Sequence, residues 1–260
     1  MGRRLIRLAA AAALILLPGC VNISRATPTA LPASGYLDSA SLDALSHSFT
    51  PSPQPLEWTP EPAAIGPGTD RWWLAIAHAE LRAPEAAQHF DCILGTRLDQ
   101  SPRPALTRLM NRLLVDSEGL SRRLTAEHPR IRPIKVQPEL APCQRIPDGA
   151  RDTPSWPAGG AVMGAAYGRL FSDLAPDQRT RLQDMGREIG VSRQICRMNW
   201  AGDVRDGQAI GQALYDRAAA TPAFAADLEA ARAEIVAARA EGLTNPSCAA
   251  ERRALGVRIN

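Results

Sequence analysis

From residue 70 onward, apolar side chains recur every three or four positions, which is the spacing of an amphipathic helix. The first of these stretches predicts a helix over residues 70–81, which Pro84 ends. A second helix is expected over residues 85–94. Residues 101–128 carry a leucine-rich stripe with arginines mostly on the other faces, a pattern that predicts one long amphipathic helix or a pair of helices.

Prolines divide the rest of the chain. Residues 134–156 hold four prolines and are expected to form an irregular connection. Thr221 followed by Pro222 has the pattern of an N-cap and a first helical residue. Further helices are expected from Pro157 through Leu170, from Pro176 to about Trp200, from Asp203 to Ala220, and from Pro222 through Ile235. No stretch alternates in the manner of a β-strand.

The composition agrees with a helical fold. The chain has 260 residues, of which 45% are apolar and only 5% aromatic, enough for one core built from small and aliphatic side chains. We therefore expect an all-α, single-domain helical bundle over residues 69–243. Residues 21–68 are rich in proline, serine and threonine and are expected to form a tether or strap laid over the domain. Residues 244–260 are expected to form a C-terminal tail.

Residues 1–20 have the pattern of an export signal. Three arginines precede an apolar run from Leu8 to Leu17 that is too short for a permanent membrane span. The following Leu17-Pro18-Gly19-Cys20 resembles a bacterial lipobox, in which the cysteine is lipidated and becomes the mature N-terminus. Because proline is unusual before that glycine, ordinary signal cleavage is the alternative. Either reading predicts a protein exported to the periplasm or anchored by lipid at the cell envelope.

The charge pattern limits the choice of partners. The net charge is +3, and basic residues are interspersed with acids, so nucleic acid is not an expected partner. A membrane is expected to be contacted only through the N-terminal lipid. Lys135 is the only lysine, so arginine supplies nearly all of the positive charge. Genomic base composition is a sufficient explanation of that bias.

The cysteines predict disulfides. Besides Cys20 the chain has four, and in an exported protein an even number is typical of two bridges. Four cysteines allow three pairings, among which Cys92–Cys143 and Cys196–Cys248 are favoured because each would tie a loop or tail to a helix near it in the chain. Metal binding is the rival interpretation, but no pair has C-x-x-C spacing and no suitably spaced histidine lies nearby. We expect no metal or cofactor.

Three short segments place arginine, glycine or proline at expected helix boundaries. They are Arg130-Ile131-Arg132-Pro133, Pro157-Ala158-Gly159-Gly160, and Ser192-Arg193 followed by Asn199 and Asp203. Arginines offer paired donors to an oxyanion, and a helix that starts at glycine offers free backbone N–H groups and a favourable dipole. Together these segments predict a binding site for a phosphate-like anion.

The order and spacing of the three segments resemble the signature of the type 2 phosphatidic acid phosphatase and vanadium haloperoxidase superfamily, K-x6-R-P, P-S-G-H and S-R-x5-H-x3-D. Within that superfamily, the segments most resemble those of the bacterial class A non-specific acid phosphatases. There the first segment reads A-K-x-x-Y-x-R-x-R-P, and here Leu124 to Pro133 reads L-T-A-E-H-P-R-I-R-P. The third reads G-x-S-R-x-x-C-G-x-H-W-x-S-D-V, and here Gly190 to Val204 reads G-V-S-R-Q-I-C-R-M-N-W-A-G-D-V.

The resemblance implies a helical acid phosphatase fold, but the groups that carry the family's reaction are replaced. The nucleophilic histidine corresponds to Asn199, whose amide has no lone pair available for attack. The histidine that acts as general acid corresponds to Gly160, which has no side chain. The lysine that neutralises the phosphate corresponds to Thr125, and the serine of the second segment to Ala158.

The residues that match the family form the anion-binding part of the site. The resemblance implies that Arg132, Arg193 and the Gly159 N–H would bind a phosphate-like anion. Asp203 matches the aspartate that orients the nucleophile, and we expect it to accept a hydrogen bond from the Asn199 amide or to pair with Arg197.

Arg197 and the four histidines each have few possible roles. Arg197 stands where the family usually has glycine, and it is expected either to add a cation to the site or to block it in part. The four histidines, His47, His78, His89 and His128, all precede the second and third segments. His128 lies two residues before Arg130 and would have to reach across the pocket to act as a nucleophile, so a structural role at a helix end is favoured.

These replacements favour a phosphatase-like protein without phosphomonoesterase activity that keeps an anion pocket, because losing both nucleophile and acid should leave almost no catalysis. A working acid phosphatase that uses water or His128 is the first alternative. A protein that keeps only the fold is the second.

Overall fold

A computed structural model describes residues 34–53, 65–139, 141–143, 145–146 and 149–256. The chain divides into two units, Met1–Ala30 and Leu31–Asn260, and every described residue belongs to the second unit. The expected export signal and the lipidation site at Cys20 lie outside the described residues.

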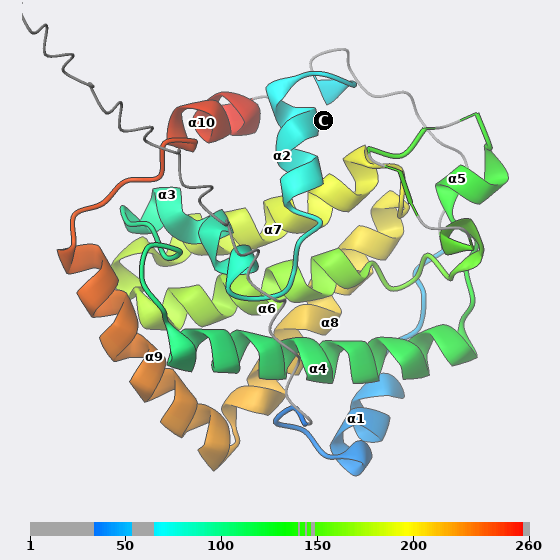
Figure 1. The fold of residues 1–260 in the computed structure, drawn as a ribbon. Coiled ribbons are helices and arrows are strands. Elements are labelled where there is room, and N and C mark those ends of the chain that lie inside the picture. The colour runs from blue at the N-terminus through cyan, green and yellow to red at the C-terminus, as the bar shows by residue number, and fades with distance from the viewer. Residues whose placement is uncertain (1–33, 54–64, 140, 144, 147–148, 257–260) are drawn as a thin grey trace, which may run out of the picture. The chain divides into compact units, whose positions relative to one another are not determined.

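The described residues form helices joined by loops and contain no strand, so the predicted all-α class is confirmed (Figure 1). The α-helices are α1 Ser39–Ser46, α2 Asp70–Ala77, α3 Asp91–Leu94, α4 Pro104–Glu127, α5 Pro133–Val136, α6 Gly159–Leu174, α7 Arg179–Ile195, α8 Ala201–Ala219, α9 Pro222–Ala240 and α10 Cys248–Gly256. The short 3-10 helices are η2 Glu85–Phe90, η3 Ala150–Asp152 and η4 Pro176–Gln178. No helix in this described part of the chain is both long and apolar enough to cross a membrane.

Several predicted helix boundaries are confirmed by their capping contacts. The Thr221 hydroxyl accepts a hydrogen bond from the Phe224 N–H at 3.3 Å, and Pro222 is the first residue of α9. The stretch 101–128 holds one helix, α4 from Pro104 to Glu127, and not a pair. The segment 85–94 is helical but begins as the 3-10 helix η2, and α3 ends at Gly95, whose φ of 68° is left-handed.

Three short helices were not predicted. Helix α1 lies in the expected strap, α5 in the expected irregular connection and α10 in the expected tail. Each has nine residues or fewer, so a helical period has little room to appear in the sequence. Tertiary contacts hold α1 and α10, because α1 packs on α4 and α10 packs on α2.

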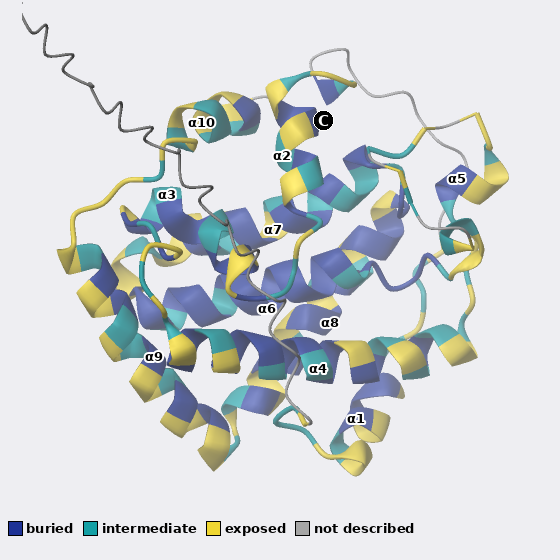
Figure 2. Ribbon diagram, in the orientation of Figure 1, coloured by how far each residue is buried: buried dark blue, intermediate teal, exposed yellow. Residues whose placement is uncertain are grey.

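Helix α6 lies at the centre of the packing, with α7 and α8 against it (Figures 1 and 2). Nearly all of its residues are buried, whereas α4 and α9 each keep an exposed face. Glycines let these backbones approach closely. A Cβ atom added at Gly164 would lie 2.3 Å from the Gly186 carbonyl oxygen on α7, and one at Gly211 on α8 would lie 2.1 Å from the Val162 carbonyl oxygen.

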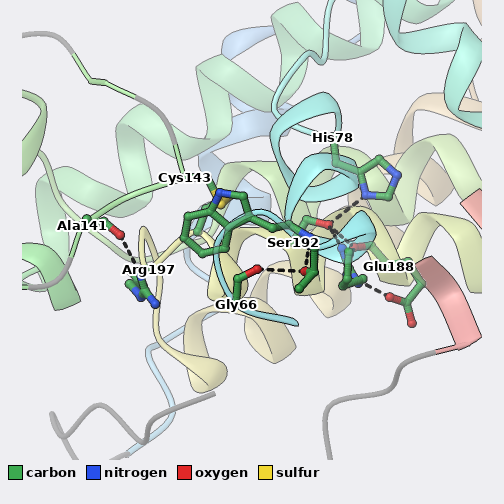
Figure 3. Close-up of a disulfide and its surroundings, with 11 residues drawn as sticks. Gly66, His78, Ala141, Cys143, Glu188, Ser192 and Arg197 are labelled. Atoms are coloured by element: carbon green, nitrogen blue, oxygen red, sulfur yellow. Dashed lines mark hydrogen bonds and ion pairs between the residues drawn. A yellow bond between two sulfur atoms is a disulfide. The ribbon is translucent and has the colours of Figure 1, made fainter. Parts of the chain in front are cut away.

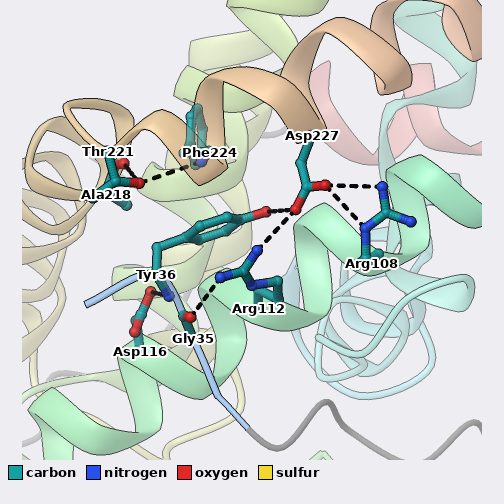
Figure 4. Close-up of polar contacts among 9 residues, drawn as sticks. All are labelled: Gly35, Tyr36, Arg108, Arg112, Asp116, Ala218, Thr221, Phe224 and Asp227. Atoms are coloured by element: carbon teal, nitrogen blue, oxygen red, sulfur yellow. Dashed lines mark hydrogen bonds and ion pairs between the residues drawn. The ribbon is translucent and has the colours of Figure 1, made fainter. Parts of the chain in front are cut away.

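The segment before α1 is fixed to α4 and α9 by a polar cluster (Figure 4). The Tyr36 hydroxyl donates to Asp227 at 2.7 Å, and the same carboxylate pairs with Arg108 and Arg112 at 2.8 and 3.1 Å. The backbone N–H groups of Tyr36 and Leu37 donate to Asp116. Burial and hydrogen bonding to Asp227 raise the pKa of Tyr36, so the phenol stays protonated and keeps donating.

Two disulfides form, as the number of cysteines predicted, but the favoured pairing was wrong. The bridges are Cys92–Cys248 and Cys143–Cys196, with Cα–Cα distances of 5.4 and 4.7 Å. The prediction assumed that nearness in the chain decides the pairing. In the fold, α10 is held near α3, and the end of α7 lies beside the segment around Cys143 (Figure 3).

Candidate functional site

The three sequence segments meet at the N-terminus of α6. Arg132 is the N-cap residue of α5, Gly159 is the first residue of α6, and Arg193 lies in the last turn of α7. The Arg193 side chain lies directly against Gly160, since a Cβ atom there would be 2.6 Å from Arg193 Cδ and 2.7 Å from Cγ. The Arg132 guanidinium donates to the Met198 carbonyl at 2.7 Å, and the Met198 N–H donates to the Arg193 carbonyl at 3.0 Å, so Arg132 contacts the segment that follows α7.

The start of α6 presents unused backbone donors. Ala158, the N-cap residue, provides no side-chain cap, and its carbonyl accepts from the N–H groups of Ala161 and Val162. Within the described part of the chain, no acceptor is recorded for the N–H groups of Gly159 and Gly160. A Cβ atom at Gly159 would meet nothing within 4 Å, so the space beside it is open. Free N–H groups, a helix dipole and open space are what a small anion needs.

The two arginines are held in different ways. Arg132 donates to the Met198 carbonyl at 2.7 Å and to the Thr153 hydroxyl at 2.9 Å, which fixes its guanidinium. The Arg193 guanidinium forms no hydrogen bond or ion pair with any residue that the structure describes, although the Arg193 backbone carbonyl accepts from the Met198 N–H at 3.0 Å. Burial, helped by the charge of Arg193 and opposed by Asp203, lowers the pKa of Arg132 to about 10, and burial also lowers the pKa of Arg193. An anion between them would relieve this repulsion.

Asn199 is buried and has a structural contact. Its side-chain amide donates to the Ser155 carbonyl at 2.5 Å, and the Ser155 N–H donates to the Arg130 carbonyl at 2.6 Å. These bonds join the segment before α8 to the segments before α5 and α6. The amide therefore holds backbone segments together at the position where the family has its nucleophile.

Asp203 is fully buried near the start of α8, and its ion pair is with Arg130 at 2.7 Å. Its carboxylate also accepts from the Ser155 hydroxyl at 2.5 Å and from the Trp200 N–H at 3.0 Å. Burial raises the pKa of Asp203, whereas these donors and the charge of Arg130 oppose the rise. Arg130 and Ser155 were missed as partners of Asp203; Arg130 lies in the first motif segment, whereas Ser155 lies in none of the three, so the sequence carried no signal for it.

Arg197 has a left-handed backbone, with φ of 59°, at the position where the family usually has glycine. Glycine adopts this conformation without a steric penalty, which gives a physical reason for the family's preference. The Arg197 guanidinium lies 5.0 Å from the centre of the Trp72 ring and donates to the Ala141 carbonyl at 2.6 Å, beside the Cys143–Cys196 bridge (Figure 3).

Thr125 and His128 make contacts that are structural. The Thr125 hydroxyl donates to the Ser121 and Arg122 carbonyls of its own helix. His128 ends α4, and its ring packs edge-on against Trp156 with 5.5 Å between centroids. These contacts agree with the helix-end role expected for His128.

A second buried cluster involves Ser192, next to Arg193 in the third motif. The Ser192 hydroxyl is 2.8 Å from His78 Nδ1 and accepts from Arg71 at 2.9 Å, and Arg71 pairs with Glu188 (Figure 3). Burial, together with the charges of His89 and Arg71, holds the pKa of His78 well below its usual value. His78, Arg71 and Ser192 are all buried, so this pair of serine and histidine is sealed from solvent.

Comparison with known proteins agrees with the motifs. No protein-family model matches the chain. It is 26% identical to an acid phosphatase from Zymomonas mobilis over 177 residues, 68% of this chain and 67% of that protein. Non-specific acid phosphatases from Providencia stuartii and Salmonella typhimurium are 26% and 25% identical over 168 and 170 residues, which are 64% and 65% of this chain and 67% and 68% of those proteins. The chain is thus similar in sequence to bacterial acid phosphatases, in agreement with the resemblance of its motifs.

Proposed function

We propose that this protein is a phosphatase-like anion-binding protein that has lost phosphomonoesterase catalysis. One observation carries the proposal. The Arg193 guanidinium has no partner among the described residues, and it lies against Gly160, which stands where the resembled phosphatases have their general-acid histidine. Arg132, Arg193 and the Gly159 N–H supply donors for an oxyanion. Asn199 and Gly160 supply neither a nucleophile nor a proton.

Calorimetric titration with inorganic phosphate and with vanadate tests the binding part of the proposal. We expect saturable binding that Arg193→Ala weakens by about tenfold or more, because a charged hydrogen bond contributes about 1.5–3 kcal/mol. Arg187→Ala is the matched control, since Arg187 is an exposed arginine of the same helix. Absence of binding, or binding that Arg193→Ala leaves unchanged, would favour a protein that keeps only the fold.

A turnover assay tests the catalytic part. We expect no hydrolysis of a chromogenic phosphate monoester above background between acid and neutral pH. His128→Ala is the informative variant, because His128 is the histidine nearest to the first motif in the sequence. Turnover by the unmodified protein that this variant abolishes would overturn the proposed loss of catalysis.

We also propose that the protein is exported, either to the periplasm or as a lipoprotein at the cell envelope. The signal-like residues 1–20 and the two disulfides support this, because disulfides persist in oxidising compartments. Mass spectrometry of protein from the cell envelope separates the two forms, since lipidation adds acyl mass at Cys20 and Cys20→Ser would abolish it. Full-length chain found only in the cytosol would overturn the proposal.

A further inference from the structure

A separate pocket of about 160 Å³ lies between the segment that leads into α5 and the residues of η3. Its lining comes from two stretches of chain, Pro129, Arg130, Ile131 and Lys135 from the first and Arg151, Asp152, Thr153 and Pro154 from the second. None of Arg132, Gly159 and Arg193 lines it. The pocket therefore has a different lining from the proposed anion site, which it adjoins through the hydrogen bond from Arg132 to Thr153.

The positive charges of this pocket are not equally compensated. Arg130 pairs with Asp203, and Lys135 pairs with Asp152 at 2.6 Å. Arg151 donates to the Ile134 carbonyl at 2.6 Å, and no described carboxylate forms an ion pair with it. Because one NH1 contact leaves its remaining N–H donors available, Arg151 is the cation best placed to receive an anionic group.

The other walls of the pocket are apolar. Ile131 is 55% exposed although it is a large aliphatic residue, and prolines 129 and 154 stand beside it. Val136, one residue beyond Lys135, is 41% exposed. A ligand that covered Ile131 would remove apolar surface from water, which is favourable. The pocket thus combines an apolar wall with one cation, Arg151, that no described carboxylate neutralises.

We propose that this pocket binds the carboxylate of a small organic acid, with Arg151 as the anchor and the carbon chain of the ligand on Ile131. One uncompensated cation matches a single negative charge better than the double charge of a phosphate monoester. The volume of about 160 Å³ accommodates only a small molecule. This inference is independent of anion binding at Arg193, and the two can fail separately.

Because Lys135 is the only lysine of the chain and lines this pocket, a label on lysine reports on ligand binding there. Reductive methylation of the purified protein with ¹³C-formaldehyde labels Lys135 and keeps its charge, while the labelled N-terminal amine has a separate NMR signal. Titration with hexanoate at constant ionic strength should give a saturable shift of the Lys135 signal. Hexanol and sodium chloride are the matched ligands that lack the carboxylate or the carbon chain.

Four variants decide the outcome. Arg151→Gln should weaken hexanoate binding by about tenfold or more, because it removes a charged hydrogen-bond donor. Arg145→Gln, which changes an exposed arginine of the same loop, should have no effect, and neither should Arg193→Ala. Ile131→Glu should also abolish binding, and because the Ile131 side chain is exposed it provides a test even where Arg151→Gln unfolds the protein.

Other outcomes overturn the proposal. A linear shift without saturation, a shift that Arg151→Gln and Ile131→Glu leave unchanged, or equal affinity for hexanol would each exclude a carboxylate site. Inorganic phosphate that shifts the Lys135 signal with the affinity of hexanoate would assign the pocket to phosphate instead.

One outcome would support the separation of the two sites. Arg193→Ala should lose vanadate binding and keep hexanoate binding.

Discussion

The glycines in the middle of helix α6 and at its N-terminus have different neighbours. In the middle of the helix, Gly164 lies against backbone, because a Cβ atom there would be 2.3 Å from the Gly186 carbonyl oxygen. At the N-terminus, Gly160 lies against a side chain, the methylene groups of Arg193. Backbone cannot move aside cheaply, whereas a side chain can change rotamer. The middle of α6 is therefore expected to determine stability, and its N-terminus to determine how the proposed anion site is arranged.

The contact between Gly160 and Arg193 shows what a histidine at position 160 would displace. Where the family places an acid, this chain has Gly160, and Arg193 occupies the adjoining space. Restoring the histidine would force Arg193 to a new position. In the proposed function, the absence of a histidine at Gly160 and the position of Arg193 are thus coupled, which a motif comparison alone does not show.

The largest effect is expected from Gly164→Ala. The added methyl group would collide with backbone of α7 and with Ile189, so we expect a loss of about 3 kcal/mol in the free energy of unfolding. Urea denaturation measures it, and Gly256→Ala is the control because nothing lies within 4 Å of that Cβ position. A Gly164→Ala protein as stable as the parent would break the distinction between the two parts of α6.

A smaller effect, on binding and not on stability, is expected at the N-terminus of α6. Gly160→Ala must displace Arg193, so vanadate affinity should fall by about tenfold while the unfolding free energy changes by less than about 1 kcal/mol. Gly256→Ala is the matched control, because nothing lies within 4 Å of its Cβ position and Gly256 ends α10, outside the three motif segments. We expect it to change affinity by less than about threefold. A Gly160→Ala protein that binds vanadate as tightly as the parent would mean that the position of Arg193 does not determine the affinity.

The helices and the site differ in how far the sequence could predict them. Long amphipathic segments such as α4 and α9 show a helical period, so their existence followed from the pattern. Helices α1 and α10 are too short for a period and depend on packing against α4 and α2. The disulfide pairing also required the fold, because Cys92 and Cys248 are 156 residues apart in the chain.

At the site, residue types were predictable but side-chain directions were not. In the structure, Arg193 lies against the Gly160 Cβ position at the start of α6, and Arg132 contacts the Met198 carbonyl after α7, while anion binding by these residues stays a prediction. The ion pair of Asp203 with Arg130 was not predicted, because a sequence does not show which of several nearby arginines points toward a buried carboxylate. The left-handed backbone of Arg197 could have been suspected from the family's glycine, which is a conformational signal and not a chemical one.

The smallest effect is expected at α10, which offers a region where stability can change without altering the anion site. Burial and the nearby charge of Asp91 raise the pKa of Glu251 to about 7, and burial raises the pKa of Asp91 to about 6. Because both values exceed those of an unfolded chain, the folded protein holds more protons, and its stability should fall as the pH rises from about 4 to about 7.

Glu251→Gln removes one of these two titrations. Since Glu251 is only half-buried, we expect the variant to be more stable than the parent by about 1 kcal/mol at pH 8, or about 2–4 °C in Tm, and equally stable near pH 4. Glu229→Gln, at an exposed position of α9, should show no such pH-dependent difference. Vanadate affinity should be unchanged in both. A Glu251→Gln protein with altered vanadate affinity would show that the anion site responds to global stability, and the separate roles assigned to the two parts of α6 would then be wrong.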